Sequence, residues 1–240
     1  IAGLVGQAEV GLRVGELEAA VAAGTEAAVL AEADGNLADR ARALIATGDA
    51  LSQLGRYDDA AATLGDAVSS ADAIGARGKS VFANSLVAMI EIRRQRMDAA
   101  GMLASDILSA TAEGTPDIDE LAGLGRLNLI MGHVLSHRGE FELVPAYYQR
   151  SSEIFTGIGD DIGATMTVLS LGNLAYRRKN LDEAALTYRQ VAERCHTIDY
   201  HFGLSLAYTN LGNVLFDQKK VDEALKSLRQ AEHELRRLGT

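Results

Sequence analysis

Two histidines at helical spacing are the residues of this chain whose types could do chemistry. His133 and His137 are four residues apart, so on a helix both imidazoles would lie on one side and could bind a metal ion, and Glu140 follows them. Zinc peptidases with such a pair carry a glutamate between the histidines, whereas valine, leucine and serine intervene here. We therefore predict that both histidines line a binding surface and that the protein uses no metal and no cofactor.

The single cysteine, Cys195, is the other candidate for reactive chemistry. Neither His196 nor His201 stands where a catalytic base would be needed, and the thiol is expected near the end of a helix, so packing is its expected role. The sequence also lacks a phosphate-binding glycine loop, a Walker sequence and a serine elbow. We predict that the protein is not an enzyme.

The elements that must position these side chains repeat about every forty residues. The letters LGN at 171–173 and LDEA at 181–184 return as LGN at 211–213 and VDEA at 221–224. The pattern divides the chain into the units 1–40, 41–80, 81–124, 125–164, 165–204 and 205–240. A period of this length in helix-forming sequence predicts one array of antiparallel helical hairpins, and therefore an all-α fold.

Three positions of each unit are expected to hold the hairpins together. Position 8 is small where two helices cross, position 20 is small within the second helix, and position 17 is apolar where the second helix begins. Position 8 is Ala8, Gly48, Ala88, Gly132, Gly172 and Gly212. Position 20 is Ala20, Ala60, Ala100, Val144, Ala184 and Ala224. Position 17 is Leu17, Tyr57, Met97, Phe141, Leu181 and Val221.

The ends of the helices carry further signals. An acidic residue after position 17 is expected in the first turn of the second helix, where it faces unpaired N–H groups. These residues are Asp58, Asp98, Glu142, Asp182 and Asp222. The first helix is expected to end at residues that tolerate a left-handed conformation, Gly55, Gly139 and Asn180. Pro145 is expected in the first turn of its helix, and residues 113–117 are expected to form a loop.

The first and third units depart most from this pattern. Gly11, Gly15 and Gly24 each cost about 1 kcal/mol relative to alanine inside a helix, so the first unit is expected to fray. The third unit carries Ala104 at position 24 and Glu91 where an apolar residue is usual, so its packing is expected to be weaker.

The residue types at positions 8, 17, 20 and 24 together resemble the tetratricopeptide repeat. Position 24 is bulky in four units, as Leu64, Tyr148, Tyr188 and Leu228. The resemblance covers the whole chain and is strongest over 169–194 and 209–235. It implies a right-handed α-solenoid of six antiparallel helical hairpins. The forty-residue period is similar to that of the subgroup in kinesin light chains, spindle-orientation adaptors and bacterial multidomain regulators.

The resemblance also implies a concave groove lined by the first helices, at unit positions 5, 9, 12 and 13. Glu9 and Asp49 make the early units acidic, so the binding site is expected in units 3 to 6. The predicted partner-binding residues are Met89, Ile92, Arg93, His133, His137, Asn173, Tyr176, Arg177, Asn213, Phe216 and Asp217.

Two residue types in this set suggest how a partner would be held. Asn173 and Asn213 offer an amide donor and acceptor to the backbone of an extended peptide, unless asparagine is simply common in this subgroup. Arg93 and Arg177 would bind the carboxylates of an acidic partner, or would pair with nearby acidic side chains. Both alternatives stay open for each pair.

Composition and charge argue against two classes of protein, those that bind nucleic acid and those that span a membrane. The net charge of −10 disfavours direct binding of nucleic acid, and the sequence has no run of about 18 apolar residues that would predict a membrane span. One unpaired cysteine is typical of a cytoplasmic protein. The chain opens at Ile1 rather than at a methionine, and we interpret it as part of a longer protein.

We predict a non-catalytic module that binds a protein or peptide, or attached domains of the same protein, in a regulatory or scaffolding role. The alternative is the ligand-sensing domain of a bacterial multidomain regulator, joined to a nucleotide switch or a transcriptional module. Flanking sequence would distinguish the two. A homodimer through the N-terminal unit, residues 1–31, is also predicted.

Overall fold

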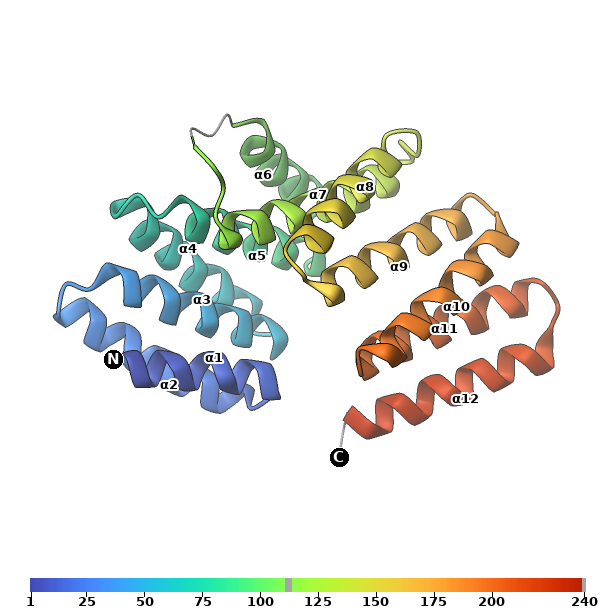
Figure 1. Cartoon of the computed structure of the whole chain (residues 1–240), viewed down its shortest axis with the longest axis horizontal. Helices are drawn as coiled ribbons and strands as arrows, with labels where there is room; N and C mark the ends of the chain where they lie inside the picture. The colour runs from blue at the N-terminus through green and yellow to red at the C-terminus, as the bar shows by residue number, and fades with distance from the viewer. Residues whose placement is uncertain (111–113, 239–240) are drawn as a thin grey trace. The chain divides into compact units, whose positions relative to one another are not determined.

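The computed structural model of the chain describes residues 1–110 and 114–238 (Figure 1). Within these ranges it consists of twelve α-helices and has no strand, which confirms the all-α fold. The helices are α1 Ala2–Val14, α2 Leu17–Ala33, α3 Leu37–Gln53, α4 Tyr57–Ala73, α5 Arg77–Arg93, α6 Met97–Ser109, α7 Ile118–Arg138, α8 Val144–Gly157, α9 Asp161–Arg177, α10 Leu181–Thr197, α11 His201–Asp217 and α12 Val221–Leu238. None of the described helices is long and apolar enough to cross a membrane.

The chain divides into two compact units, Ile1–Val134 and Leu135–Thr240. In each of them a helix packs on the helix that follows it, as the hairpins α3/α4 and α11/α12 illustrate (Figure 1). First helices also contact one another, α1 on α3 and α3 on α5 in the first unit, and α9 on α11 in the second. The first helices therefore form one layer in each unit, as expected for helical hairpins of a solenoid.

The six repeat boundaries drawn from the sequence stay a prediction. Their starts at residues 41, 81, 125, 165 and 205 fall inside the first helices α3, α5, α7, α9 and α11. The reason is that the letters which fix the period lie in the middle of each hairpin, at 171–173 and 181–184, and leave its outer ends undefined.

The predicted packing positions are confirmed where α3 meets α4 and where α9 meets α10. A Cβ atom added to Gly48 would lie 2.6 Å from Cγ of Leu64, and one added to Gly172 would lie 2.7 Å from Cε1 of Tyr188. A small residue at position 8 is thus needed to admit the bulky side chain at position 24. All six residues at position 20 are buried.

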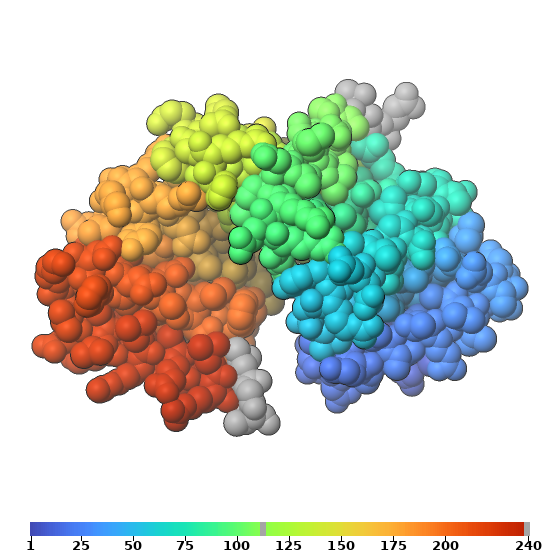
Figure 2. All heavy atoms as spheres, turned by 180° about the vertical axis from the view of Figure 1, so that it is seen from behind, coloured from blue at the N-terminus to red at the C-terminus, as the bar shows by residue number. Residues whose placement is uncertain are grey.

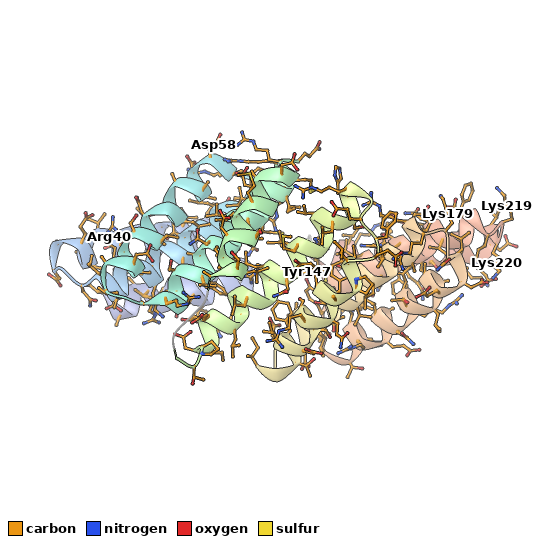
Figure 3. The ribbon with its side chains drawn as sticks, turned by 90° about the horizontal axis from the view of Figure 1, so that it is seen from above. Arg40, Asp58, Tyr147, Lys179, Lys219 and Lys220 are labelled. Carbon is orange, nitrogen blue, oxygen red and sulfur yellow. The ribbon has the colours of Figure 1, made fainter. Side chains whose placement is uncertain are left out.

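Every first helix is followed by a left-handed residue at repeat position 15. These residues are Gly15, Gly55, Gln95, Gly139, Lys179 and Lys219, with φ between 61° and 82°. The prediction for Gly55 and Gly139 is confirmed, and that for Asn180 is wrong. Asn180 has φ −82° and precedes α10, while Lys179 before it takes the left-handed conformation. Lys179 and Lys219 are exposed at their turns, where the long side chains reach solvent (Figure 3).

The start of α8 also differs from the prediction. Phe141 and Glu142 were expected to open this helix, but α8 begins at Val144, with a proline in its first turn as predicted. Pro145 has no N–H, so it cannot donate to the carbonyl of Phe141 as a longer helix would require. The guanidinium of Arg178 donates to that carbonyl instead, at 2.6 Å. The acidic residues expected in the first turns of α4, α6, α10 and α12 are confirmed.

The glycines of the first unit have a different role from the one expected. Gly15 lies in the turn after α1 rather than inside a helix. A Cβ atom on Gly11 would lie 3.2 Å from Cβ of Ala20, and one on Gly24 would lie 2.2 Å from Oγ1 of Thr47. These two glycines permit close helix contacts, so part of their helix-propensity cost is offset by packing. Fraying of this unit stays a prediction.

The insertion in the third unit separates α6 from α7. Glu113 lies outside the described residues, while residues 114–117 form no helix, in agreement with the predicted loop. Asp117 ends the loop by accepting a hydrogen bond of 2.8 Å from the backbone N–H of Glu120, which caps α7. Glu91, the unusual acidic residue of this unit, is largely buried and pairs with Arg94 at 3.0 Å.

Candidate functional site

A pocket of about 310 Å³ opens on the first-helix layer of the first unit. Helices α1, α3 and α5 and the start of α7 all contribute to it. It is lined by Glu9, Leu12, Arg13, Arg42, Ile45, Ala46, Asp49, Lys79, Phe82 and Asp119. We call it the first-helix pocket.

The first-helix pocket combines apolar side chains with charges of both signs. Leu12, Ile45 and Phe82 are partly buried and give it its apolar surface. Two ion pairs also line it and link neighbouring first helices. Arg42 of α3 lies 2.9 Å from Glu9 of α1, and Lys79 of α5 lies 2.9 Å from Asp119 of α7. An occupant would therefore meet apolar contact beside both positive and negative groups.

Arg13 and Asp49 are the two remaining charged residues of this pocket. Arg13 is exposed, and its Nε lies 3.5 Å from the backbone carbonyl of Glu9. Asp49 accepts a hydrogen bond of 3.3 Å from Gln53. Each keeps most of its hydrogen-bonding capacity for a ligand. Repeat positions 9 and 13 line this pocket, as Glu9, Asp49 and Arg13. These residues belong to units 1 and 2, whereas the site was predicted in units 3 to 6.

The predicted site residues of α5 lie outside the first-helix pocket. Met89 and Ile92 are partly buried, and Arg93 is exposed. Nη1 of Arg93 donates to the carbonyl oxygen of Ser52 at 3.0 Å and to its Oγ at 3.2 Å. This arginine therefore joins α5 to α3 through a serine, and its binding of an acidic partner stays a prediction.

The two histidines of α7 have different surroundings. His133 is mostly buried, and this burial lowers its pKa from 6.5 to about 4, so its imidazole is neutral at pH 7. His137 is exposed. In the two ranges that the structure describes, no group of three or more His, Cys, Asp or Glu side chains is placed to hold a metal ion.

Asn173, predicted to hold a peptide backbone, is used within the second unit. Its Oδ1 accepts hydrogen bonds from the hydroxyl of Tyr188 at 2.7 Å and from Nδ2 of Asn210 at 3.1 Å. Burial holds the pKa of Tyr188 well above its usual range, so this hydroxyl remains a donor. Asn213 at the same repeat position is exposed, and Leu228 stands at the repeat position of Tyr188 in its hairpin.

The remaining predicted residues of the second unit lie at the ends of α9 and α11. The hydroxyl of Tyr176 donates to Oδ2 of Asp217 at 2.7 Å, and this hydrogen bond raises the tyrosine's pKa. Nη1 of Arg177 donates to Oγ of Ser136 at 3.4 Å. Phe216 is 59 % exposed, the largest apolar side chain presented at these ends.

These contacts share a pattern that was not predicted from the sequence. At three junctions between successive hairpins, position 13 bonds position 12 of the hairpin before it, as Arg93 to Ser52, Arg177 to Ser136, and Asp217 to Tyr176. At the other two junctions position 12 is Leu12 or Ile92, which has no polar side-chain atom. Comparing these two positions between successive units would have suggested the three contacts, because the residue types in each of them can form a hydrogen bond. The side chains at the layer of first helices thus also connect the hairpins.

Cys195 has the predicted packing role. It is fully buried in the core of the second unit, and burial raises its pKa to about 11, so the thiolate is scarce at neutral pH. A Cβ atom on Gly203 would lie 2.6 Å from its sulfur, which shows how closely α11 approaches α10.

Comparisons with known proteins agree with this architecture. The family model described as tetratricopeptide repeat matches residues 205–231. No curated protein sequence matches the chain. The match to the tetratricopeptide repeat covers the last hairpin, and the described helices before it form hairpins of the same kind. The assignment of the chain to the subgroup of the forty-residue period stays a prediction.

Three solved structures share the fold at low sequence identity. BtubC (BKLC) from P. vanneervenii is 17 % identical, with 93 % of this chain and 92 % of that chain covered and a TM-score of 0.65. The Rap conjugation gene regulator of the plasmid pLS20, in complex with the Phr* peptide, is 16 % identical over 98 % of this chain and 64 % of that one, with a TM-score of 0.72. The apo quorum sensor NprR from B. thuringiensis is 12 % identical over 97 % and 75 %, with a TM-score of 0.68.

Proposed function

We propose that this chain is a non-catalytic binding module that holds a peptide segment of a partner protein, or of an attached domain, against its first helices. Its role would be regulatory or scaffolding. The observation that carries the proposal is the first-helix pocket, in which apolar side chains lie beside charged groups of both signs. An apolar side chain of a peptide would contact Leu12, Ile45 and Phe82, while its polar groups would meet Arg13 and Asp49.

Two further features support the proposal. In the second unit, Asn213 and Phe216 are exposed on the first helix α11, where an amide and an aromatic ring can contact an extended peptide. Among proteins of the same fold, the pLS20 regulator was solved with a peptide bound. The first-helix pocket carries charges of both signs, so an acidic partner is proposed only for the exposed side chains Arg93 and Arg177.

Selection of peptides from a displayed random library on the purified chain tests the proposal. Peptides that survive selection are synthesised, and their affinity is measured by titration calorimetry for the wild-type chain and for variants. We expect Arg13→Ala and Leu12→Glu to weaken binding by about tenfold or more, because they remove a charge and place one on apolar surface. Arg56→Ala is the matched control, since Arg56 is exposed and lies outside the pocket.

Two results would contradict this assignment. If no peptide is selected, the binding role loses its support. If peptides bind but the two pocket variants behave like Arg56→Ala, binding occurs elsewhere, and Asn213→Ala with Phe216→Ser then tests the face of the second unit.

Ligand sensing is the alternative function, and the volume of the first-helix pocket supports it. A volume of about 310 Å³ is at the lower end of the range of small-molecule sites, about 300–1,000 Å³. A thermal-shift screen of small metabolites distinguishes it from peptide binding. A metabolite that raises the melting temperature of the wild-type chain but not of Arg13→Ala would support sensing.

A further inference from the structure

A second cavity lies where the end of α4, the start of α5 and the end of α6 meet (cyan to green in Figures 1 and 2). Its volume is about 450 Å³, and it shares no lining residue with the first-helix pocket. The residues that define it include Asp72, Ser80, Val81, Asp106, Ile107 and Ala110. We call it the α4–α6 cavity.

The corresponding place one hairpin earlier is filled by an arginine. A shift of forty residues gives three pairs of equivalent positions, which are Arg40 and Ser80, Glu32 and Asp72, and Ser70 and Ala110. The guanidinium of Arg40 donates a hydrogen bond to Oγ of Ser70 and lies 3.7 Å from the carboxylate of Glu32 (Figure 3). The side chain of Arg40 is only 19 % exposed, so it occupies the space between these two helices.

The α4–α6 cavity is open because the equivalent residues are smaller and α6 is shorter. Ser80 replaces the arginine, and α6 has 13 residues where α4 has 17. Ala110 therefore lies beyond the end of α6 and is exposed, whereas Ser70 is buried within α4. The apolar surface left in the cavity comes from Val81, which is 6 % exposed, and from the partly buried Ile107.

Two carboxylates of the α4–α6 cavity have no basic side chain to compensate them. Asp72 and Asp106 make no ion pair with any residue that the structure describes, and the segments 57–76 and 97–125 contain no lysine, arginine or histidine. The cavity also lies at the C-terminal ends of α4 and α6, where the helix dipoles are negative, and neither helix has a basic residue in its last turn. These charges and dipoles together favour a cation.

The basic residues at the start of α5 are engaged elsewhere. Arg77 also lines the cavity, but its Nε lies 2.8 Å from Oε1 of Glu120 in α7, and that carboxylate is 8 % exposed. Lys79 lies 2.9 Å from Asp119, also in α7. Because both cations are committed to α7, the charge left uncompensated in the cavity is that of its two aspartates.

We propose that the α4–α6 cavity binds an arginine side chain of a partner protein, in the place that Arg40 fills one hairpin earlier. The aliphatic part of the bound side chain packs on Val81 and Ile107, and its guanidinium meets Asp72 and Asp106. Arginine suits this site better than lysine, because the guanidinium offers five N–H donors in one plane to two carboxylates. The site is separate from the first-helix pocket and does not depend on what that pocket holds.

Magnetic resonance titration of the isotope-labelled chain with a capped arginine, N-acetylarginine amide, tests the proposal. We expect saturable shifts of the backbone amide signals of Gly75, Ser80 and Ala110, with a dissociation constant of about 1–10 mM because one side chain is a small ligand. N-acetylcitrulline amide has nearly the same shape without the charge and is the matched ligand control. It is expected to bind about tenfold more weakly or not at all.

Variants of the chain test which residues hold the guanidinium. Asp72→Asn and Asp106→Asn are each expected to weaken binding by about fivefold. Asp66→Asn is the matched control, because Asp66 is exposed, lies outside the cavity and is the equivalent of Asp106 one hairpin earlier. Ser80→Arg restores the internal arginine of the preceding hairpin, so it is expected to abolish binding and to raise the melting temperature by about 1–3 °C.

Four results would overturn the proposal. They are the absence of saturable shifts with capped arginine, equal binding of the citrulline compound, undiminished binding by the Ser80→Arg chain, and an equal loss of affinity in Asp66→Asn and Asp72→Asn. Agmatine, a free guanidinium compound, tests the source of the ligand. If agmatine binds a hundredfold more tightly than capped arginine, the site takes a small metabolite, and the assignment to a partner's arginine is wrong.

Discussion

The hydroxyl of Tyr188 donates a hydrogen bond of 2.7 Å to Oδ1 of Asn173 and so joins α10 to α9. Tyr188 is 1 % exposed, and its ring lies against Gly172, so the hydroxyl has little access to water. The asparagine that resembles a peptide-binding residue therefore contributes first to the stability of the hairpin.

The first prediction compares asparagines at one repeat position. Asn173→Ala is expected to lower the free energy of unfolding by about 1–3 kcal/mol, because it leaves a buried hydroxyl without its acceptor. Asn213→Ala is expected to change it by less than about 0.5 kcal/mol, since that side chain is exposed. Urea unfolding followed by circular dichroism measures both. Equal losses in the two variants would contradict this role for Asn173.

The second prediction concerns glycines inside helices. Gly172→Ala is expected to destabilise the chain by about 1–2 kcal/mol, because its Cβ would lie 2.7 Å from the Tyr188 ring. Gly65→Ala in α4 is expected to stabilise it by about 0.5–1 kcal/mol, since nothing lies within 4 Å of the added atom. Opposite signs in thermal unfolding are the result to look for, and a gain at Gly172 would show that the crossing can relax.

The third prediction uses the left-handed turn residues. Gln95→Gly and Lys219→Gly are each expected to raise the free energy of unfolding by about 0.5–1 kcal/mol, because residues with a Cβ are strained at φ 61° and 64°. Lys220→Gly is the control, since Lys220 is not among the residues with positive φ. Glycine there only raises the conformational entropy of the unfolded chain, so this variant is expected to be less stable. Stabilisation by the control as well would point to a cause other than turn conformation.

The fourth prediction concerns the pH dependence of stability. The pKa of His133 is lowered from 6.5 to about 4 in the folded chain, so between these values the unfolded chain binds the additional proton. The contribution of this group is therefore present above pH 6.5 and is lost as the pH falls towards 4, by at most about 3 kcal/mol. His133→Gln should flatten the stability profile over that window. Urea midpoints at several pH values, compared with His137→Gln as the exposed control, measure the difference.

Much of the fold could be predicted because its causes are local. The period of helix-forming letters indicates hairpins, and the small residues at Gly48 and Gly172 mark the helix crossings. The prediction was wrong at two helix ends, where neighbouring residues could each have taken the predicted conformation or begun the helix. At the turn before α10 the left-handed conformation falls on Lys179 rather than on Asn180, and at α8 the helix start is moved to Val144 by the missing N–H of Pro145.

The sequence by itself determined the hairpins, the packing positions and the layer of first helices that presents polar side chains. Only the tertiary structure decided what those side chains do. Asn173 accepts hydrogen bonds from Tyr188 and Asn210, and Ser52 accepts one from Arg93. Each of these contacts depends on how two helices cross and on the rotamer that the crossing allows. The first-helix pocket has the same origin, since four helices that are far apart in sequence must meet to form it.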